Sequence, residues 1–143
     1  FYLLRALMPH FKGQRRGAIV TIGSNAAHVP RMQMAAYCAS KAAVIAYLES
    51  LRVEMHGSGV KVVSIAPGYI DTPMTAVNRY PMPFMLPADE AARRFAKVID
   101  AGTGYAVIPW QMGVVAKLMR LLPNAIFDRV FARAGRKPRG LPL

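Results

Sequence analysis

Two stretches of similar composition stand out in the chain: Gly17-Ala-Ile-Val-Thr-Ile22 and Val60-Lys-Val-Val-Ser-Ile-Ala66. Both are short, rich in β-branched residues and flanked by glycine or proline, which is typical of strands buried in a parallel sheet. Between them, residues 35–55 are mainly apolar or small and contain no helix breaker, which predicts a long helix. A strand, a helix and a second strand in this order form a βαβ unit with a right-handed crossover. The sequence therefore predicts an α/β fold built around a parallel sheet.

The remaining elements follow from apolar spacing and from the positions of glycine and proline. Helical spacing predicts four further helices, over about 2–12, 87–100, 111–122 and 124–134. Tyr105-Ala-Val-Ile108 predicts a third strand. Residues 71–87 contain four prolines, so they cannot form one regular element; such a loop is typical of a substrate loop, and a plain surface loop is the alternative. No repeat or linker divides the chain, so residues 1–143 are predicted to lie in one domain, with 111–143 as a helical C-terminal extension.

The composition limits the classes of partner. Lys and Arg number 19 against 7 Asp and Glu, a formal charge of +12 that makes nucleic acid, acidic lipid and phosphorylated ligands candidates. The single cysteine, Cys38, excludes an intrachain disulfide and suits a reducing, cytoplasmic compartment. No run reaches the roughly 18 apolar residues that a membrane-spanning helix needs. The opening residues lack signal-peptide architecture and read as mid-chain sequence, so an N-terminal part before Phe1 is expected.

Three polar residues near the first strand and the long helix indicate proton-transfer chemistry. Ser24 follows the first strand at its carboxyl end, where open parallel sheets bind their ligands. Tyr37 and Lys41 lie four residues apart at the start of the long helix, so their side chains share one face. A nearby ammonium group lowers the tyrosine pKa from its usual value of about 10, which suits the hydroxyl to acid/base work at neutral pH. With Ser24 holding a carbonyl oxygen, this set fits carbonyl reduction or alcohol oxidation.

The exit of the second strand adds a further motif. It reads Pro67-Gly68-Tyr-Ile-Asp-Thr72, which combines a turn, a glycine and a hydroxyl at the neighbouring strand end. Ser24, thirteen residues before Tyr37, then Tyr37-Cys-Ala-Ser-Lys41 and this exit together resemble the C-terminal half of a classical short-chain dehydrogenase/reductase, over residues 1–109. The resemblance implies a doubly wound, Rossmann-type parallel sheet and an NAD(P)-dependent oxidoreductase that interconverts a secondary alcohol and a ketone.

The resemblance also implies roles for individual residues. Ser24 would orient the substrate carbonyl, and Tyr37 would be the acid/base. Lys41 would bind the nicotinamide ribose and lower the pKa of Tyr37. The nicotinamide of NAD or NADP would be lined by residues of the second strand's exit, which are Pro67, Gly68, Ile70 and Thr72. Thr72 is alternatively a plain helix cap, because Pro73 follows it.

The same resemblance places part of the family's machinery outside this sequence. The glycine-rich phosphate loop and the residue that separates NAD from NADP would lie upstream of Phe1. Residues 1–143 alone are therefore expected to be inactive and weakly stable. The family's dimer pairs two helices that match residues 1–12 and 36–55, so a homo-oligomer is expected when the domain is complete.

Other classes of protein share some of these features. The extended branch of the superfamily, the sugar-nucleotide epimerases and dehydratases, shares the tyrosine–lysine pair but not the Pro67-Gly68-x-x-x-Thr72 pattern. A non-catalytic fragment, or a binding protein that keeps the site by descent, is the alternative from a different class. His10, His28 and His56 lie singly without metal-ligand spacing, so structural or solvent-facing roles and no metal are expected. No nucleic-acid-binding module is present in the sequence, so a nucleic-acid partner is not expected.

The C-terminal residues carry an open alternative of their own. From residue 117 onward seven basic residues face one acid, Asp128, and apolar residues are interleaved with them. Basic amphipathic helices of this kind suit peripheral contact with a membrane surface through residues 111–134. The other interpretation is a C-terminal lobe that covers the substrate pocket and has a solvated basic rim.

Overall fold

The computed structural model of the chain describes residues 2–29, 34–78 and 80–132. The predicted strands and helices are present, with boundaries shifted by a few residues. In chain order the elements are α1 (Tyr2–Gln14), β1 (Gly17–Ile22), the 3-10 turn η1 (Asn25–Ala27), α2 (Ala35–Glu54), β2 (Val60–Pro67), β3 (Ile70–Asp71), α3 (Pro73–Ala76), β4 (Leu86–Pro87), α4 (Ala88–Ala101), β5 (Tyr105–Ile108), α5 (Trp110–Arg120) and α6 (Asn124–Ala132).

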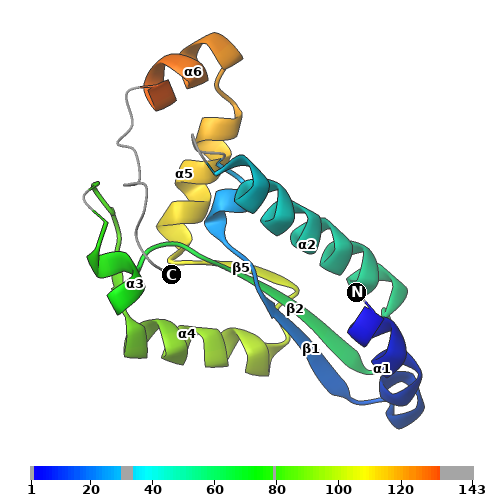
Figure 1. Cartoon of the computed structure of the whole chain (residues 1–143). Coiled ribbons are helices and arrows are strands. Elements are labelled where there is room, and N and C mark those ends of the chain that lie inside the picture. The colour runs from blue at the N-terminus through cyan, green and yellow to red at the C-terminus, as the bar shows by residue number, and fades with distance from the viewer. Residues whose placement is uncertain (1, 30–33, 79, 133–143) are drawn as a thin grey trace.

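The main sheet has three strands in the order β1-β2-β5, and both pairs are parallel. Gly17 pairs with Val60 and Ile22 with Ile65, so β1 and β2 run in register along the whole of β1. The shorter β5 pairs with the second half of β2, beginning with Ser64 opposite Tyr105. The parallel α/β architecture predicted from the two β-branched stretches is therefore confirmed (Figure 1).

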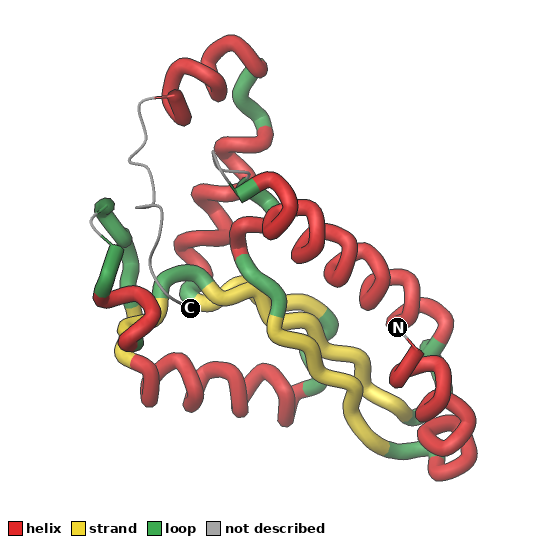
Figure 2. The backbone as a smooth tube through the Cα atoms, in the orientation of Figure 1, coloured by secondary structure: helices red, strands yellow, loops and turns green. Residues whose placement is uncertain are grey.

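Helices cover both faces of this sheet (Figure 2). On one face α1 and α2 pack over a buried cluster that consists of Ile19, Leu48, Leu51, Met55, Val60 and Val62, with Leu4, Met8 and Phe11 of α1 at its margin. On the other face α4 contributes Phe95, Val98 and Ile99 to a cluster around Val63, Ile65 and Ile108. Burial of these apolar side chains on both sides of β2 is the main stabilising contribution to the fold.

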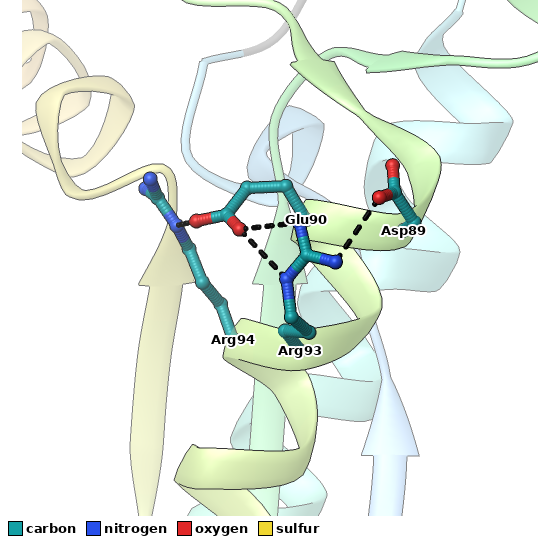
Figure 3. A network of polar contacts seen from close by, with 4 residues as sticks. All are labelled: Asp89, Glu90, Arg93 and Arg94. Atoms are coloured by element: carbon teal, nitrogen blue, oxygen red, sulfur yellow. Dashed lines mark hydrogen bonds and ion pairs between the residues drawn. The ribbon is translucent and has the colours of Figure 1, made fainter.

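The start of α4 follows the rules for helix N-termini. Asp89 and Glu90 lie in its first turn, where the helix dipole favours negative charge. Figure 3 shows both carboxylates turned toward Arg93 and Arg94, one turn further along. Glu90 is 3.0 Å from Arg93 and 2.7 Å from Arg94, and hydrogen bonds from Arg94 and then Arg93 lower the pKa of this exposed carboxyl. The positive charges of these arginines are therefore paired with carboxylates of the same helix.

The segment between Ile70 and Pro87 is more structured than the sequence predicts. Residues 73–76 form the short helix α3, and β3 pairs in parallel with β4, so that Ile70 lies opposite Leu86. The prolines exclude one continuous element, as expected, but two-residue strands separated by a loop leave no periodic pattern to detect. Residues 133–143, part of the predicted C-terminal extension, lie outside the described residues. No described helix meets the length and apolarity needed to cross a membrane.

Candidate active site at the carboxyl end of the sheet

Ser24 lies in the turn that leaves β1. It has extended backbone angles and caps η1, where its Oγ accepts a hydrogen bond from Ala26 N at 3.2 Å. The turn is fixed on both sides, because Gly23 N donates to Ile65 O at 2.6 Å and Asn25 Nδ2 donates to Met112 O at 3.5 Å. Ser24 lies at the carboxyl end of the sheet, as the sequence predicts, and it is half-buried there.

Tyr37 and Lys41 lie in the first two turns of α2. A crossover helix runs antiparallel to the strands it connects, so α2 starts at the carboxyl end of the sheet. Lys41 Nζ is 5.7 Å from the centroid of the Tyr37 ring, which confirms that the two side chains share one face. Tyr37 is 43% exposed, whereas the intervening Cys38 is 5% exposed and anchors this turn in the protein. The phenol ring is thus open to solvent beside a cation.

Close packing around the exit of β2 explains why this turn contains a glycine. Gly68 N donates to Ile108 O at 2.8 Å, which ties the turn to β5. A Cβ atom at this position would stand 2.8 Å from Met112 Cγ and 3.2 Å from Pro109 Cδ, so only glycine fits without displacement. The close approach involves the start of α5, and the sequence motif alone does not reveal this partner.

Ile70 and Thr72 continue the same exit, and Pro67 ends β2 just before it. Thr72 is the N-cap residue of α3, and Pro73 is at the first helical position. The sequence left open whether Thr72 caps a helix, and in the structure it does. Thr72 N donates to Thr75 Oγ1 at 2.9 Å, and the two hydroxyl oxygens are 3.2 Å apart. Thr75 Oγ1 also donates to Ile70 O at 2.6 Å. Both Ile70 and Thr72 are half-buried.

The predicted residues share one end of the sheet. Figure 1 shows β1, β2 and β5 pointing toward the end at which α2 and α5 begin. The direct contact between predicted catalytic side chains is that of Tyr37 with Lys41. Within the described ranges, no hydrogen bond joins the Ser24 hydroxyl to Tyr37 or Lys41. The assignment of the complete catalytic and cofactor-binding set therefore stays a prediction.

His28 has a partner that the sequence could not reveal. Its Nε2 is hydrogen-bonded to the Tyr105 hydroxyl, and the two rings meet edge to face with centroids 5.7 Å apart. Burial, and then the charge of Arg120, lowers the pKa of His28, while Glu49 acts in the opposite direction. Burial raises the pKa of Tyr105 to about 12. Both groups are therefore neutral near pH 7, and the hydrogen bond ties the loop after Ser24 to β5.

Other features of the described residues lie away from this site. A groove of about 540 Å³ runs between α1 and α2 and is lined by Arg5, Met8, Tyr47 and Leu51 among others. No group of three His, Cys, Asp or Glu side chains in the described ranges is arranged to hold a metal ion.

Comparisons with known proteins agree on a single family. The family model for short chain dehydrogenase matches residues 1–82. An uncharacterized oxidoreductase of Myxococcus xanthus (strain DK1622) is 37% identical over 130 residues, which cover 91% of this chain and 51% of the relative.

Two solved structures are similar in fold and sequence. A short chain dehydrogenase from Burkholderia cenocepacia J2315 in complex with NADP has a TM-score of 0.71 at 29% identity, over 89% of this chain and 52% of that one. A 3-ketoacyl-(acyl-carrier-protein) reductase from Brucella melitensis complexed with NADH has a TM-score of 0.60 at 28% identity, over 73% of this chain and 48% of that one. The chain thus spans about half the length of these proteins.

Proposed function

Because the chain belongs to the short-chain dehydrogenase family, we propose that the protein is an NAD(P)-dependent oxidoreductase that interconverts a secondary alcohol and a ketone. The observation that carries this proposal is the Tyr37–Lys41 pair, with Lys41 Nζ 5.7 Å from an exposed phenol ring at the carboxyl end of a parallel sheet. We assign the chain to the C-terminal half of the family's domain, since the Ser24, Tyr37–Lys41 and Pro67–Thr72 motifs follow one another in that order.

The residues at this end of the sheet have the chemistry that a nicotinamide cofactor requires. Lys41 is half-buried, and among the described residues no carboxylate forms an ion pair with it. Its ammonium group is therefore available to ribose hydroxyls. Pro67, Gly68, Ile70 and Thr72 offer half-buried apolar surface and a hydroxyl group. The bound cofactor would supply the hydride donor or acceptor for the reaction.

The protein's own residues then handle orientation and the proton. Ser24 Oγ donates a hydrogen bond to the substrate carbonyl oxygen and holds it near the Tyr37 hydroxyl. Tyr37 gives its proton to that oxygen during ketone reduction and takes it back during alcohol oxidation. The positive charge of Lys41 stabilises the phenolate that remains after proton transfer. Acid/base groups placed in this way contribute roughly 10²–10⁴-fold to a rate.

The groove between α1 and α2 supports a second part of the proposal, a homo-oligomer. Tyr2 is 89% exposed and Leu3 is 71% exposed at the start of α1, and Val53 on α2 is 67% exposed. Pairing of these helices with the same helices of a second copy would cover this apolar surface. Light scattering coupled to size-exclusion chromatography of the full-length protein tests it, and a monomeric mass would contradict it.

The test of the catalytic proposal is Tyr37→Phe in the full-length protein. We expect turnover to fall by at least about 100-fold while cofactor affinity is retained, because only the transferable proton is removed. Tyr47→Phe, on the same helix, is the matched control and should keep its turnover. Full activity of the Tyr37→Phe protein would refute the assignment, and an inactive parent protein that still binds cofactor would favour a binding protein that keeps the site by descent.

Lys41→Met separates the two roles of the lysine. Cofactor affinity should fall, because the ribose loses a hydrogen-bond donor. The pH–rate profile should move to higher pH, because the phenolate of Tyr37 loses its stabilising charge. An unchanged profile would show that Lys41 does not act on the proton transfer.

A further inference from the structure

Helix α5 has two apolar faces, and only one of them is covered. Met112 and Ala116 face the protein interior, with exposed fractions of 7% and 3%. On the other side is a row that we call the α5 stripe, which consists of Trp110, Val114, Leu118 and Leu121, with exposed fractions of 66%, 45%, 60% and 79%. Spacings of four, four and three residues place these side chains along one side of the helix. Packing against the rest of the protein therefore covers only one of the apolar faces of α5.

Helix α6 continues this exposed apolar surface. Ile126 and Val130 are one turn apart and are each 46% exposed. Phe127 and Phe131 stack on one another with centroids 4.3 Å apart, which stabilises the short helix. Figure 1 shows α6 standing beyond the end of the sheet, away from its strands. The two helices thus form a projecting unit, and several of its apolar side chains are exposed instead of packed against the protein.

Basic residues border the apolar surface, and their charges are not neutralised locally. Lys117, Arg120 and Arg129 are exposed, and Asp128 is the one acidic residue in the sequence from 110 to 132. The ion pairs recorded for the described residues all lie on α4, where Asp89 and Glu90 hold two arginines. Positive charge is therefore concentrated on the same unit as the exposed apolar residues.

We propose that α5 and α6 form a membrane-surface anchor that binds anionic lipid, with the α5 stripe entering the boundary between headgroups and acyl chains. An interfacial helix requires an apolar face for the acyl boundary and flanking cations for the headgroups, and α5 has both. The lysine and arginine side chains can extend their apolar stems beside the stripe while their charges stay at the headgroup level. A second copy of the chain is a weaker fit, since two such basic surfaces repel each other, whereas anionic lipid attracts them.

The single tryptophan makes this surface directly measurable. Trp110 is the only tryptophan among residues 1–143, and the fluorescence that is lost in a Trp110→Phe protein reports on the start of the α5 stripe. The full-length protein, with and without this substitution, is titrated with phosphatidylcholine vesicles that contain or lack phosphatidylserine. We expect a blue shift, and quenching by brominated lipid, with the anionic vesicles. High salt should weaken this binding, because it screens the headgroup charge.

Matched variants assign the binding to this surface. Leu118→Ser combined with Leu121→Ser should lower vesicle partitioning by about tenfold or more, because it removes apolar side chains that would enter the lipid. Lys117→Gln combined with Arg120→Gln should weaken the preference for anionic vesicles. Met74→Ser and Lys97→Gln alter an exposed apolar residue of α3 and an exposed cation of α4, so they should bind as the parent protein does. All six sites are exposed, and far-UV circular dichroism verifies that each variant keeps its helices.

Three results would overturn the anchor. One is the absence of a Trp110 blue shift with anionic vesicles. Another is an equal loss of binding in the Met74→Ser or Lys97→Gln protein, which would indicate nonspecific adsorption of a basic chain. The third is a blue shift in lipid-free solution that grows with protein concentration together with a doubled mass, which would assign the α5 stripe to contact between copies.

Discussion

Strands β1 and β2 have similar β-branched sequences but very different surroundings. In β2, Val63 and Ile65 are completely buried and Val62 is 4% exposed. In β1, Val20 is 38% exposed and Ile22 is 46% exposed, although Ile22 is the register partner of Ile65. The reason is position: β2 lies between two strands and under helices on both faces, whereas β1 is the edge strand of the described sheet and is covered on one face.

The contrast separates two properties, which are whether a segment forms a strand and how much of that strand is buried. A β-branched run indicates that a segment forms a strand, but its neighbours determine how much of it is buried. The turns that follow the two strands also differ in the contacts that hold them. The exit of β1 is fixed by backbone and Asn25 contacts and presents Ser24, while the exit of β2 is packed against α5 at Gly68.

The largest expected effect compares the two paired isoleucines. Ile65→Ala should lower the free energy of unfolding by about 3 kcal/mol, because it leaves a cavity between α4 and the sheet. Ile22→Ala should lower it by less than about 1 kcal/mol, since that side chain already contacts solvent. Urea unfolding followed by circular dichroism measures both. Equal losses would mean that β1 is as buried in solution as β2.

The next comparison concerns the hydroxyls at the two strand exits, and it rests on the proposed function. Ser24→Ala in the full-length enzyme should lower turnover by about 100-fold with cofactor affinity unchanged, because the serine orients the substrate. Thr72→Val should instead raise the dissociation constant of the cofactor by about threefold to tenfold, the effect of one lost hydrogen bond. Steady-state kinetics and cofactor titration separate the two. The division of roles fails if each variant changes the other's parameter.

A third comparison uses the glycine at each exit. Gly68→Ala should destabilise the protein by about 1–3 kcal/mol, because the new Cβ meets Met112 Cγ at 2.8 Å and the rigid ring of Pro109 at 3.2 Å. Gly23→Ala should change stability by less than about 0.5 kcal/mol, since its nearest neighbour, Ile65 O, lies at 3.4 Å. Thermal unfolding of both variants is the measurement. A tolerated Gly68→Ala would show that α5 packs less closely on the β2 exit.

The smallest effect concerns His28, which follows β1 and has no counterpart after β2. Its pKa is lowered in the folded protein, so the unfolded chain binds the proton first as the pH falls. The contribution of His28 to stability is therefore present above its ordinary pKa of about 6.5 and is lost as the pH falls through the lower folded value. His28→Gln should flatten this part of the stability–pH curve when urea midpoints are compared between pH 7.5 and pH 5.

A second variant concerns the partner of His28. Tyr105→Phe removes the hydroxyl that is hydrogen-bonded to His28 Nε2. It should remove a loss of stability above pH 10, because the pKa of Tyr105 is raised to about 12 and the unfolded chain releases its proton first. A slope between pH 7.5 and pH 5 that survives in the His28→Gln protein would place its origin elsewhere.

Much of the candidate site was predictable from local sequence. The four-residue spacing of Tyr37 and Lys41 on an unbroken helix was sufficient to predict their contact, because helix geometry alone sets it. Ser24 could be placed because a strand end and its following turn are adjacent in the chain. The end of the sheet that carries the candidate site followed from the βαβ order, since the crossover helix begins at the carboxyl end of the strand before it.

The sequence by itself determined the longer helices, the three strands of the main sheet, their parallel arrangement and the residues gathered at one end of that sheet. Each of these depends on spacing within a helix or strand, or on the chirality of a connection, and both are local properties of the chain. Only the tertiary structure decided that Ile65 is buried while Ile22 is not, that Gly68 is required by α5, that His28 meets Tyr105, and that the α5 stripe is exposed among the described residues. The physical reason is that burial and long-range contacts depend on which surfaces meet across the fold. Local sequence patterns do not show which residues far apart in the chain will come into contact.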